Sequence, residues 1–167
     1  MITRAIVHGL TAGAVGTAVL NTATYLDMAI RDRPSSNVPA QTAERATDLG
    51  GITLETDGDG PDDGERRGQN RKQGVGALMG YLTGFGVGAV YGLLRPRIRA
   101  DVPRSVAALG IAAAATAATV APYSALGVSD PRTWPAESWA ADIIPHLLYG
   151  WATAATFDAL DRPRHLW

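Results

Sequence analysis

Four uncharged stretches divide the chain and constrain its fold more than any other feature. They cover residues 5–26, 74–94, 105–129 and 143–157. An α-helix rises about 1.5 Å per residue, so about 20 residues cross a hydrocarbon core about 30 Å thick. The first three stretches meet that length. The fourth meets it only if it extends back to Trp139 and if the carboxylate of Asp142 faces protein rather than lipid.

These stretches lack the regular polar face that a helix at the surface of a soluble protein needs. Glycine and threonine take the place of charged residues in them, and membrane helices tolerate both. The mean hydropathy of +0.00 therefore averages apolar spans with a charged connection. A soluble bundle with alanine-rich buried helices is the alternative for the whole chain, and a signal peptide is the alternative for the first stretch.

We expect an all-α fold in which residues 1–167 form a single membrane domain, a four-transmembrane-helix bundle. The expected spans cover about residues 5–28, 74–94, 105–128 and 139–160. Residues 31–73 form a polar loop, in which residues 39–49 are predicted to be a short amphipathic helix ended by Gly50 and Gly51. Residues 55–66 are acidic and rich in glycine and proline, which predicts a disordered stretch.

The distribution of arginine indicates an orientation. Four spans place both termini on one side of the membrane, called side A here, together with the short connection between the second and third spans. That connection holds Arg95, Arg97, Arg99 and Arg104. Because positively charged connections stay in the cytoplasm, we expect both termini of this multi-pass protein on the cytoplasmic face of the cell membrane. Trp134 and Trp139 are then expected in an external interface belt on the opposite side, side B.

Five glycines recur at intervals of four residues in the second span and define the glycine ladder: Gly76, Gly80, Gly84, Gly88 and Gly92. Residues four apart lie along one ridge of a helix, so the ladder forms a groove without side chains that another backbone can approach closely. The first span has a shorter stripe with Gly9 and Gly13. The two stripes pack against each other within one chain, or the ladder faces a neighbouring subunit in a homo-oligomer or a larger membrane complex.

Polar side chains gather toward side B within the expected spans and form a candidate polar site. They are Asn21, Asp27, Tyr123, Asp142, His146 and Tyr149. Asp142 and His146 are four residues apart and so share one helical face, where a carboxylate orients and charges an imidazole. Such a pair suits a proton relay or a polar ligand. The structural alternative is an interhelical clamp, in which Asp142 and His146 bond Asn21 or Tyr123.

Several classes of site are excluded or disfavoured. The chain has no cysteine, which excludes disulfides, thiolate zinc sites and a cysteine nucleophile. His8 and His146 are expected about 15 Å apart in depth, which disfavours a haem between them. The acidic run before Arg66 does not fit an EF-hand, because the bidentate glutamate is missing. We therefore predict no cofactor, no metal and no catalytic residue. The net charge of −1 gives no reason to expect binding to nucleic acid. The expected partner is the lipid bilayer.

One group of motifs carries a resemblance. It consists of Asp130-Pro-Arg-Thr-Trp134, then Trp139, Asp142 and Pro145-His146-Leu-Leu-Tyr149-Gly150. Together with Gly13 through Asn21, Thr24-Tyr25, Asp27 and the glycine-zipper helix, this resembles a pattern in small multi-pass integral membrane proteins of actinobacteria. One lysine against fourteen arginines is consistent with a high-GC genome. The resemblance implies a membrane location and no assigned activity.

The leading functional hypothesis is a structural or accessory membrane subunit that packs through its glycine-rich helix and is not an enzyme. The alternative is a small channel or transporter that uses the candidate polar site. A membrane-embedded enzyme acting on a lipid-like substrate through Asp142 and His146 is the third hypothesis.

Overall fold

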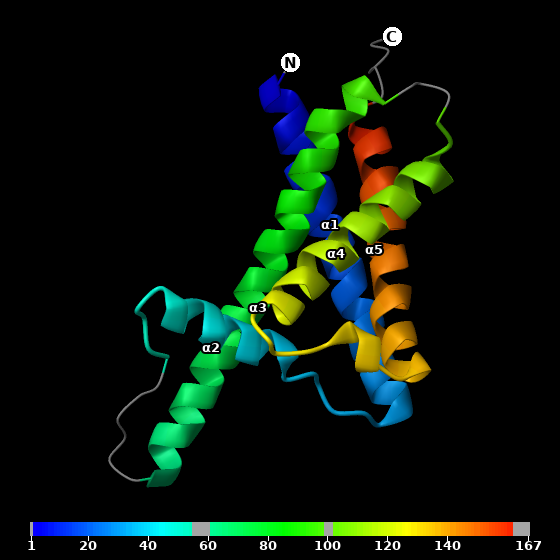
Figure 1. The fold of residues 1–167 in the computed structure, drawn as a ribbon. Helices are drawn as coiled ribbons and strands as arrows, with labels where there is room; N and C mark the ends of the chain where they lie inside the picture. Colours follow the sequence, from blue (N-terminus) through cyan, green and yellow to red (C-terminus); the bar gives the residue numbers. More distant parts are fainter. Residues whose placement is uncertain (1, 55–60, 99–101, 162–167) are drawn as a thin grey trace.

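A computed structural model describes residues 2–54, 61–98 and 102–161 of the chain (Figure 1). This part folds into α-helices and two short 3-10 turns, and no strand occurs in it. The helices are α1 (Ile2–Arg31), α2 (Val38–Leu49), α3 (Pro61–Leu94), α4 (Arg104–Ala125) and α5 (Ala136–Asp161), and the 3-10 turns are η1 (Arg95–Arg97) and η2 (Pro131–Thr133).

The expectation of an all-α fold is confirmed, but the described residues form five α-helices rather than four. Three segments are long and apolar enough to cross a membrane: Ile2–Arg31, Asp63–Arg97 and Arg104–Ala125. They correspond to α1, α3 and α4. Helix α5 does not reach that hydropathy, because Asp142, Pro145 and His146 interrupt its apolar run.

Helix α3 is much longer than the span expected at residues 74–94. It begins at Pro61, so residues 61–66, which we expected to be disordered, form its first turns. Residues 55–60 of that expected stretch lie outside the described residues. Proline is favoured at the first helical position, and the carboxylates of Asp63 and Glu65 suit the positive end of the helix dipole. These local preferences outweigh the glycine content that favoured disorder.

The two halves of the expected polar loop pack on each other. Helix α2 buries its small residues, Ala40, Thr42 and Ala43, and it ends where Gly51 adopts a positive φ of 74°. The Lys72 ammonium lies 2.6 Å from the Glu44 carboxylate and ties α3 to α2. The amphipathic helix is therefore part of the folded unit.

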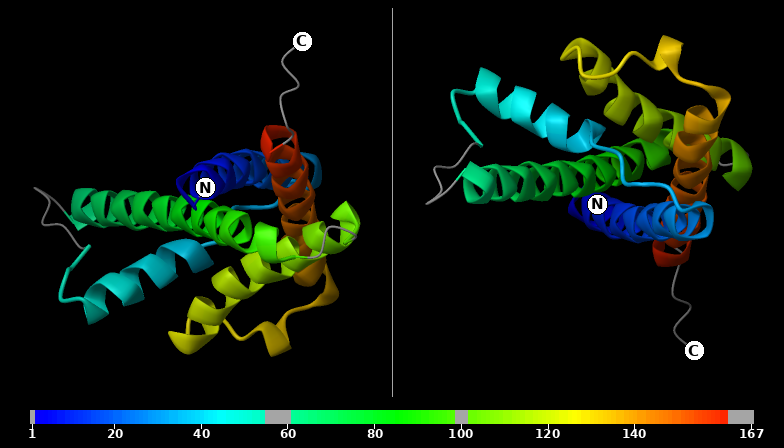
Figure 2. Two further views of the ribbon diagram at one scale, coloured as in Figure 1. Left: turned by 90° about the horizontal axis from the view of Figure 1, so that it is seen from above. Right: turned by 90° about the horizontal axis from the view of Figure 1, so that it is seen from below.

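The long helices run alternately up and down. In Figure 1 the first turn of α1, the end of α3 and the last turn of α5 lie at one end of the molecule, and α1 passes between α3 and α5. We call this the side-A end. Figure 2 shows α3 between α1 and α2, with α4 on the same side of α3 as α2. Helix α4 packs mainly against α5 and crosses α3 obliquely.

The core is made of small side chains with a few aromatic rings. Its residues are Ala12, Tyr91, Ala108, Ile111, Ala115, Tyr149, Ala154 and Phe157. Alanine at the contacts lets helices approach closely, as is typical of membrane bundles. Larger side chains such as Leu78 and Leu82 point outward and are 63% and 69% exposed. The fold thus places small residues inside and large apolar residues on its surface.

Candidate functional site

Helices α1 and α3 meet backbone to backbone through glycine. A methyl group built on Gly88 would lie 2.6 Å from Cα of Gly13, and it would also collide with the carbonyl oxygen of Gly9. Likewise, a methyl group on Gly13 would lie 3.2 Å from Cα of Gly88. A methyl group built on Gly84 would collide with the Thr17 hydroxyl. That hydroxyl donates a 2.8 Å hydrogen bond to the carbonyl of Gly13. No side chain fits at Gly88 or Gly13 without separating the two helices, and one at Gly84 would displace the Thr17 side chain.

The five rungs of the glycine ladder face different neighbours. Gly84, Gly88 and Gly92 face α1, with Gly92 against the backbone of its first turns. Gly76 faces α2 instead, because a methyl group there would lie 2.8 Å from the carbonyl carbon of Pro39. Gly80 has open space beside it. The ladder is therefore a contact with two helices of the same chain and one exposed position between them.

Two further glycines hold α5 in place, and the spacing argument missed both. Gly16 on α1 faces Tyr149, whose ring carbon Cδ2 would lie 2.8 Å from an added methyl group. Gly150 on α5 faces α4, where the amide nitrogen of Ala112 would lie 2.9 Å away. Gly16 breaks the four-residue interval of the first stripe and Gly150 is isolated, so neither belonged to a repeat. The sequence feature that could have pointed to Gly150 as a packing residue is its position directly after Tyr149, a residue of the candidate polar site.

Tyr149 joins the glycine ladder rather than the other polar residues. Its side chain is 1% exposed, and its hydroxyl donates a 2.6 Å hydrogen bond to the carbonyl oxygen of Gly84. The bond links α5 to α3 beside the α1 contact. Tyr149 thus lies where three helices meet, and the Gly84 carbonyl gives its buried hydroxyl an acceptor there.

Asp142 and His146 form a close pair on α5, and Tyr123 lies in the last turn of α4. His146 Nδ1 lies 2.7 Å from the backbone oxygen of Asp142 and 3.6 Å from its Oδ2. The His146 side chain is 10% exposed, and the Asp142 side chain is 19% exposed. Within the described residues Oδ2 of Asp142 is buried and accepts no hydrogen bond. The arrangement is chemically a carboxylate beside an imidazole.

Asn21 and Asp27 do not join that pair. Asp27 accepts hydrogen bonds from Arg31 at 3.4 Å and from Arg33 at 2.6 Å. Asn21 is half-buried on α1, and no hydrogen bond between described residues connects it with Asp142 or His146. The structure therefore brings together Asp142 and His146, but not the full candidate polar site. The expected clamp through Asn21 or Tyr123 is not formed by hydrogen bonds within this part of the chain.

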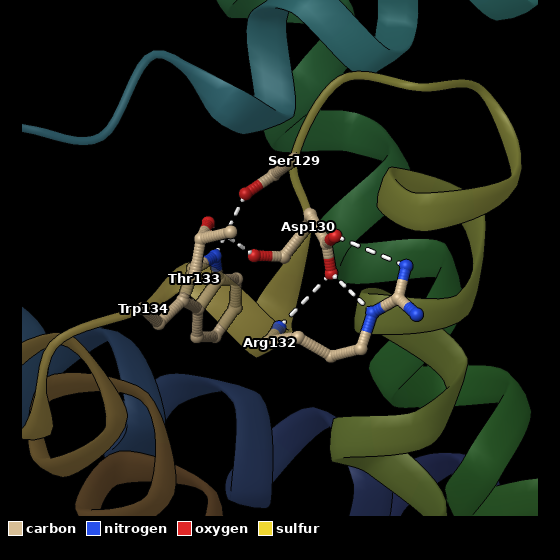
Figure 3. A network of polar contacts seen from close by, with 5 residues as sticks. All are labelled: Ser129, Asp130, Arg132, Thr133 and Trp134. Atoms are coloured by element: carbon tan, nitrogen blue, oxygen red, sulfur yellow. Dashed lines mark hydrogen bonds and ion pairs between the residues drawn. The ribbon is translucent and has the colours of Figure 1, made fainter.

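The connection between α4 and α5 is held by a compact polar network, shown in Figure 3. Asp130 Oδ1 accepts hydrogen bonds from the Arg132 backbone at 3.0 Å and from its Nε at 3.1 Å, while Thr133 donates to the Asp130 carbonyl at 2.8 Å. These bonds from Arg132 hold the pKa of Asp130 below its usual value. Trp134 donates to Ser129 at 2.8 Å and leaves its ring 5.1 Å from that of Trp139.

Ion pairs at the side-A end were not anticipated. Arg104 Nε on α4 lies 2.8 Å from Oδ2 of Asp158 on α5. Asp161 lies 3.9 Å from Arg4 and 3.7 Å from Nδ1 of His8, both on α1. In the sequence these charged residues stand at the ends of the uncharged stretches. Which of them form ion pairs depends on how α5 packs against α1 and α4.

The described residues indicate no metal site, and comparison with known proteins indicates no family. Among them no group of three or more His, Cys, Asp or Glu side chains is arranged to hold a metal ion. Comparison of the chain with protein-family models, with curated proteins and with solved structures finds no match.

Proposed function

We propose that the chain is a multi-pass integral membrane protein of the cell membrane, with α1, α3, α4 and α5 as its spans. The observation that carries this proposal is the exposure of apolar surface. No more than 28% of the apolar stretch of α1, α3 or α4 is buried within the molecule. Monomeric soluble proteins rarely expose large continuous apolar patches, and a bilayer covers such a surface.

Helix α5 is proposed as the fourth span although its hydropathy is lower. It runs between the two ends of the bundle and packs along α1 and α4. The Asp142 side chain is only 19% exposed, which meets the condition that this carboxylate faces protein rather than lipid. Charged residues in membrane helices almost always face the bundle interior. The basic residues of η1 favour the side-A end, with both termini, as cytoplasmic.

Single-cysteine labelling tests this topology directly, because the chain has no cysteine of its own. Cysteines at Ser36, Ser129 and Leu160 would be probed with a membrane-impermeant maleimide in intact cells. We expect labelling at Ser36 and Ser129 from outside and at Leu160 only after permeabilisation. Labelling of Ser129 and Leu160 from the same side would show that α5 does not cross. Release of the chain from membranes by alkaline carbonate would refute the membrane location itself.

Within the membrane we propose the role of a structural or accessory subunit that meets its partner on the open face of α3. The packing glycines of α3 are already used inside the chain, except Gly80. Around it, Leu78, Tyr81 and Leu82 are exposed and large. An open glycine between large apolar side chains suits the close approach of another helix. The resemblance to small actinobacterial membrane proteins stays a prediction.

Gly80→Leu tests the partner contact without disturbing the chain itself. We expect it to reduce the size of the detergent-solubilised assembly, as measured by light scattering after gel filtration. Gly74→Leu is the matched control, since Gly74 also lies on α3 with open space beside it but outside the glycine ladder. His146→Ala should leave the assembly unchanged as well. A single monomeric mass for wild type and all variants would rule out the subunit role.

A small channel or transporter is the second candidate, favoured by the buried Oδ2 of Asp142 beside His146. It predicts that Asp142→Asn abolishes proton flux into vesicles that contain the protein and a pH-sensitive dye. Circular dichroism of the same variant checks that it stays folded. Undiminished flux in a folded variant would exclude a protonatable role for Asp142.

A further inference from the structure

A groove between α3 and α4 is left open by the side chains of the described residues. It has a volume of about 650 Å³, within the range that holds small-molecule ligands. Its walls are almost entirely apolar, with Thr83 and Tyr91 as the polar residues of the lining. Gly86 of α3 and Gly110 of α4 lie on its surface, and a methyl group built on either meets no atom within 4 Å. These two glycines are therefore not explained by packing within the chain.

The length of the groove favours a lipid chain over a partner helix. Its α3 wall runs from Thr83 to Leu94 and its α4 wall from Val106 to Ala118. At 1.5 Å per residue, each wall is about 17 Å long. This is close to half of a hydrocarbon core of about 30 Å, the depth of one leaflet. A spanning helix of another subunit would extend beyond both ends of a groove of this length.

Positive charge lies at one end of the groove. Leu94, Ile98 and Val102 line that end, and Arg95 and Arg97 belong to the η1 turn between them. Arg97 donates a 2.8 Å hydrogen bond to the carbonyl of Leu93, which holds it at the end of α3. The arginines thus lie at the side-A end, where the headgroup of a lipid in that leaflet would be. Basic residues at this depth attract anionic lipids.

We propose that the groove binds one acyl chain of an anionic glycerophospholipid from the side-A leaflet, with the phosphate of that lipid at Arg95 and Arg97. This inference rests on the proposed membrane location. The glycines keep the groove open for the chain, while the arginines select the headgroup. Apolar contact alone would not distinguish this lipid from its neighbours, because lipid tails are as apolar as the groove.

Native mass spectrometry of the full chain in mild detergent tests the proposal. The protein would be titrated with phosphatidylglycerol and, separately, with phosphatidylcholine of the same acyl chains. We expect one tightly retained phosphatidylglycerol. The double variant Arg95→Gln with Arg97→Gln should weaken its binding about 25-fold, at about fivefold per arginine, and weaken phosphatidylcholine less, because its choline group already neutralises the phosphate charge. Both substitutions lie outside the packed core, so the variant is expected to fold.

Leucine substitutions in the groove test the acyl chain separately. Gly86→Leu and Gly110→Leu should weaken the binding of both lipids, because leucine occupies the space of the chain. Gly74→Leu is the control: Gly74 also has open space beside it but does not line the groove, so this variant should bind lipid as wild type does.

Three outcomes would overturn the proposal. One is equal retention of the two lipids by wild type, and another is unchanged lipid binding by both groove variants. The third is a wild-type dimer that Gly86→Leu dissociates without loss of lipid, which would assign the groove to a second copy of the chain. Each leaves the membrane location intact, since carbonate extraction tests that location independently.

Discussion

Substitution of Gly88 by alanine tests the backbone contact between α1 and α3 quantitatively. The new methyl group would lie 2.6 Å from Cα of Gly13 and 2.8 Å from its amide nitrogen. Carbon atoms in contact are normally about 3.5–4.0 Å apart, so the helices must separate by about 1 Å. Overpacking costs about 1–3 kcal/mol, and the upper end applies here because backbone cannot rotate away. Alanine recovers about 1 kcal/mol of helix propensity. The net loss in the free energy of unfolding is therefore about 2 kcal/mol.

Gly86→Ala is the matched control on the same helix. A methyl group there meets no atom within 4 Å, so the propensity term acts alone and stabilises the protein by about 1 kcal/mol. The two variants should shift the unfolding midpoint in opposite directions when circular dichroism follows titration with sodium dodecyl sulfate in mild detergent. Equal shifts, or a Gly88 variant as stable as wild type, would refute the idea that α1 and α3 pack through their backbones.

Two further predictions concern polar contacts. Tyr149→Phe removes the hydrogen bond to the Gly84 carbonyl and should lower the free energy of unfolding by about 1 kcal/mol in the same assay; an unchanged midpoint would contradict a structural role for the hydroxyl. Arg132 lowers the pKa of the Asp130 carboxyl in the folded protein below its ordinary value of 3.8. The contact between the two residues therefore stabilises the loop at pH above 3.8, and this stabilisation is lost as the pH falls through the lower pKa of the folded state. Arg132→Gln should raise the midpoint of the Asp130 carboxyl in an NMR titration, and an unshifted midpoint would show that the hydrogen bonds of Figure 3 do not form in solution.

The glycine interval predicted a contact line on α3 but not which helix each glycine meets. Positions four apart on a helix are rotated by about 40°, because each residue turns about 100°. From Gly76 to Gly92 the stripe therefore turns through about 160° around the helix. This explains why Gly92 faces α1, Gly76 faces α2 on the opposite side, and Gly80 faces neither. A repeat in sequence describes one helix, and the neighbours depend on the whole bundle.

The candidate polar site was predictable only where it is local. Asp142 and His146 meet because they are one helical turn apart. Asp27 instead pairs with Arg31 and Arg33, which lie closer along the chain and carry the opposite charge. The contacts of Gly150 depend on how α5 docks on α4, which no spacing within one segment encodes.

The docking of α5 has a consequence for biogenesis. During synthesis the glycine surfaces of α1 and α3 can meet as soon as both helices are in place, but Gly16 and the carbonyl of Gly84 then still lack their partner. Tyr149 supplies it for both, and its helix, α5, is synthesised after α1 and α3. A nascent chain halted before α5 would leave the glycine surface at Gly16 and Gly84 without the Tyr149 ring that covers it. Docking of α5 is therefore the step that completes the contact among α1, α3 and α5.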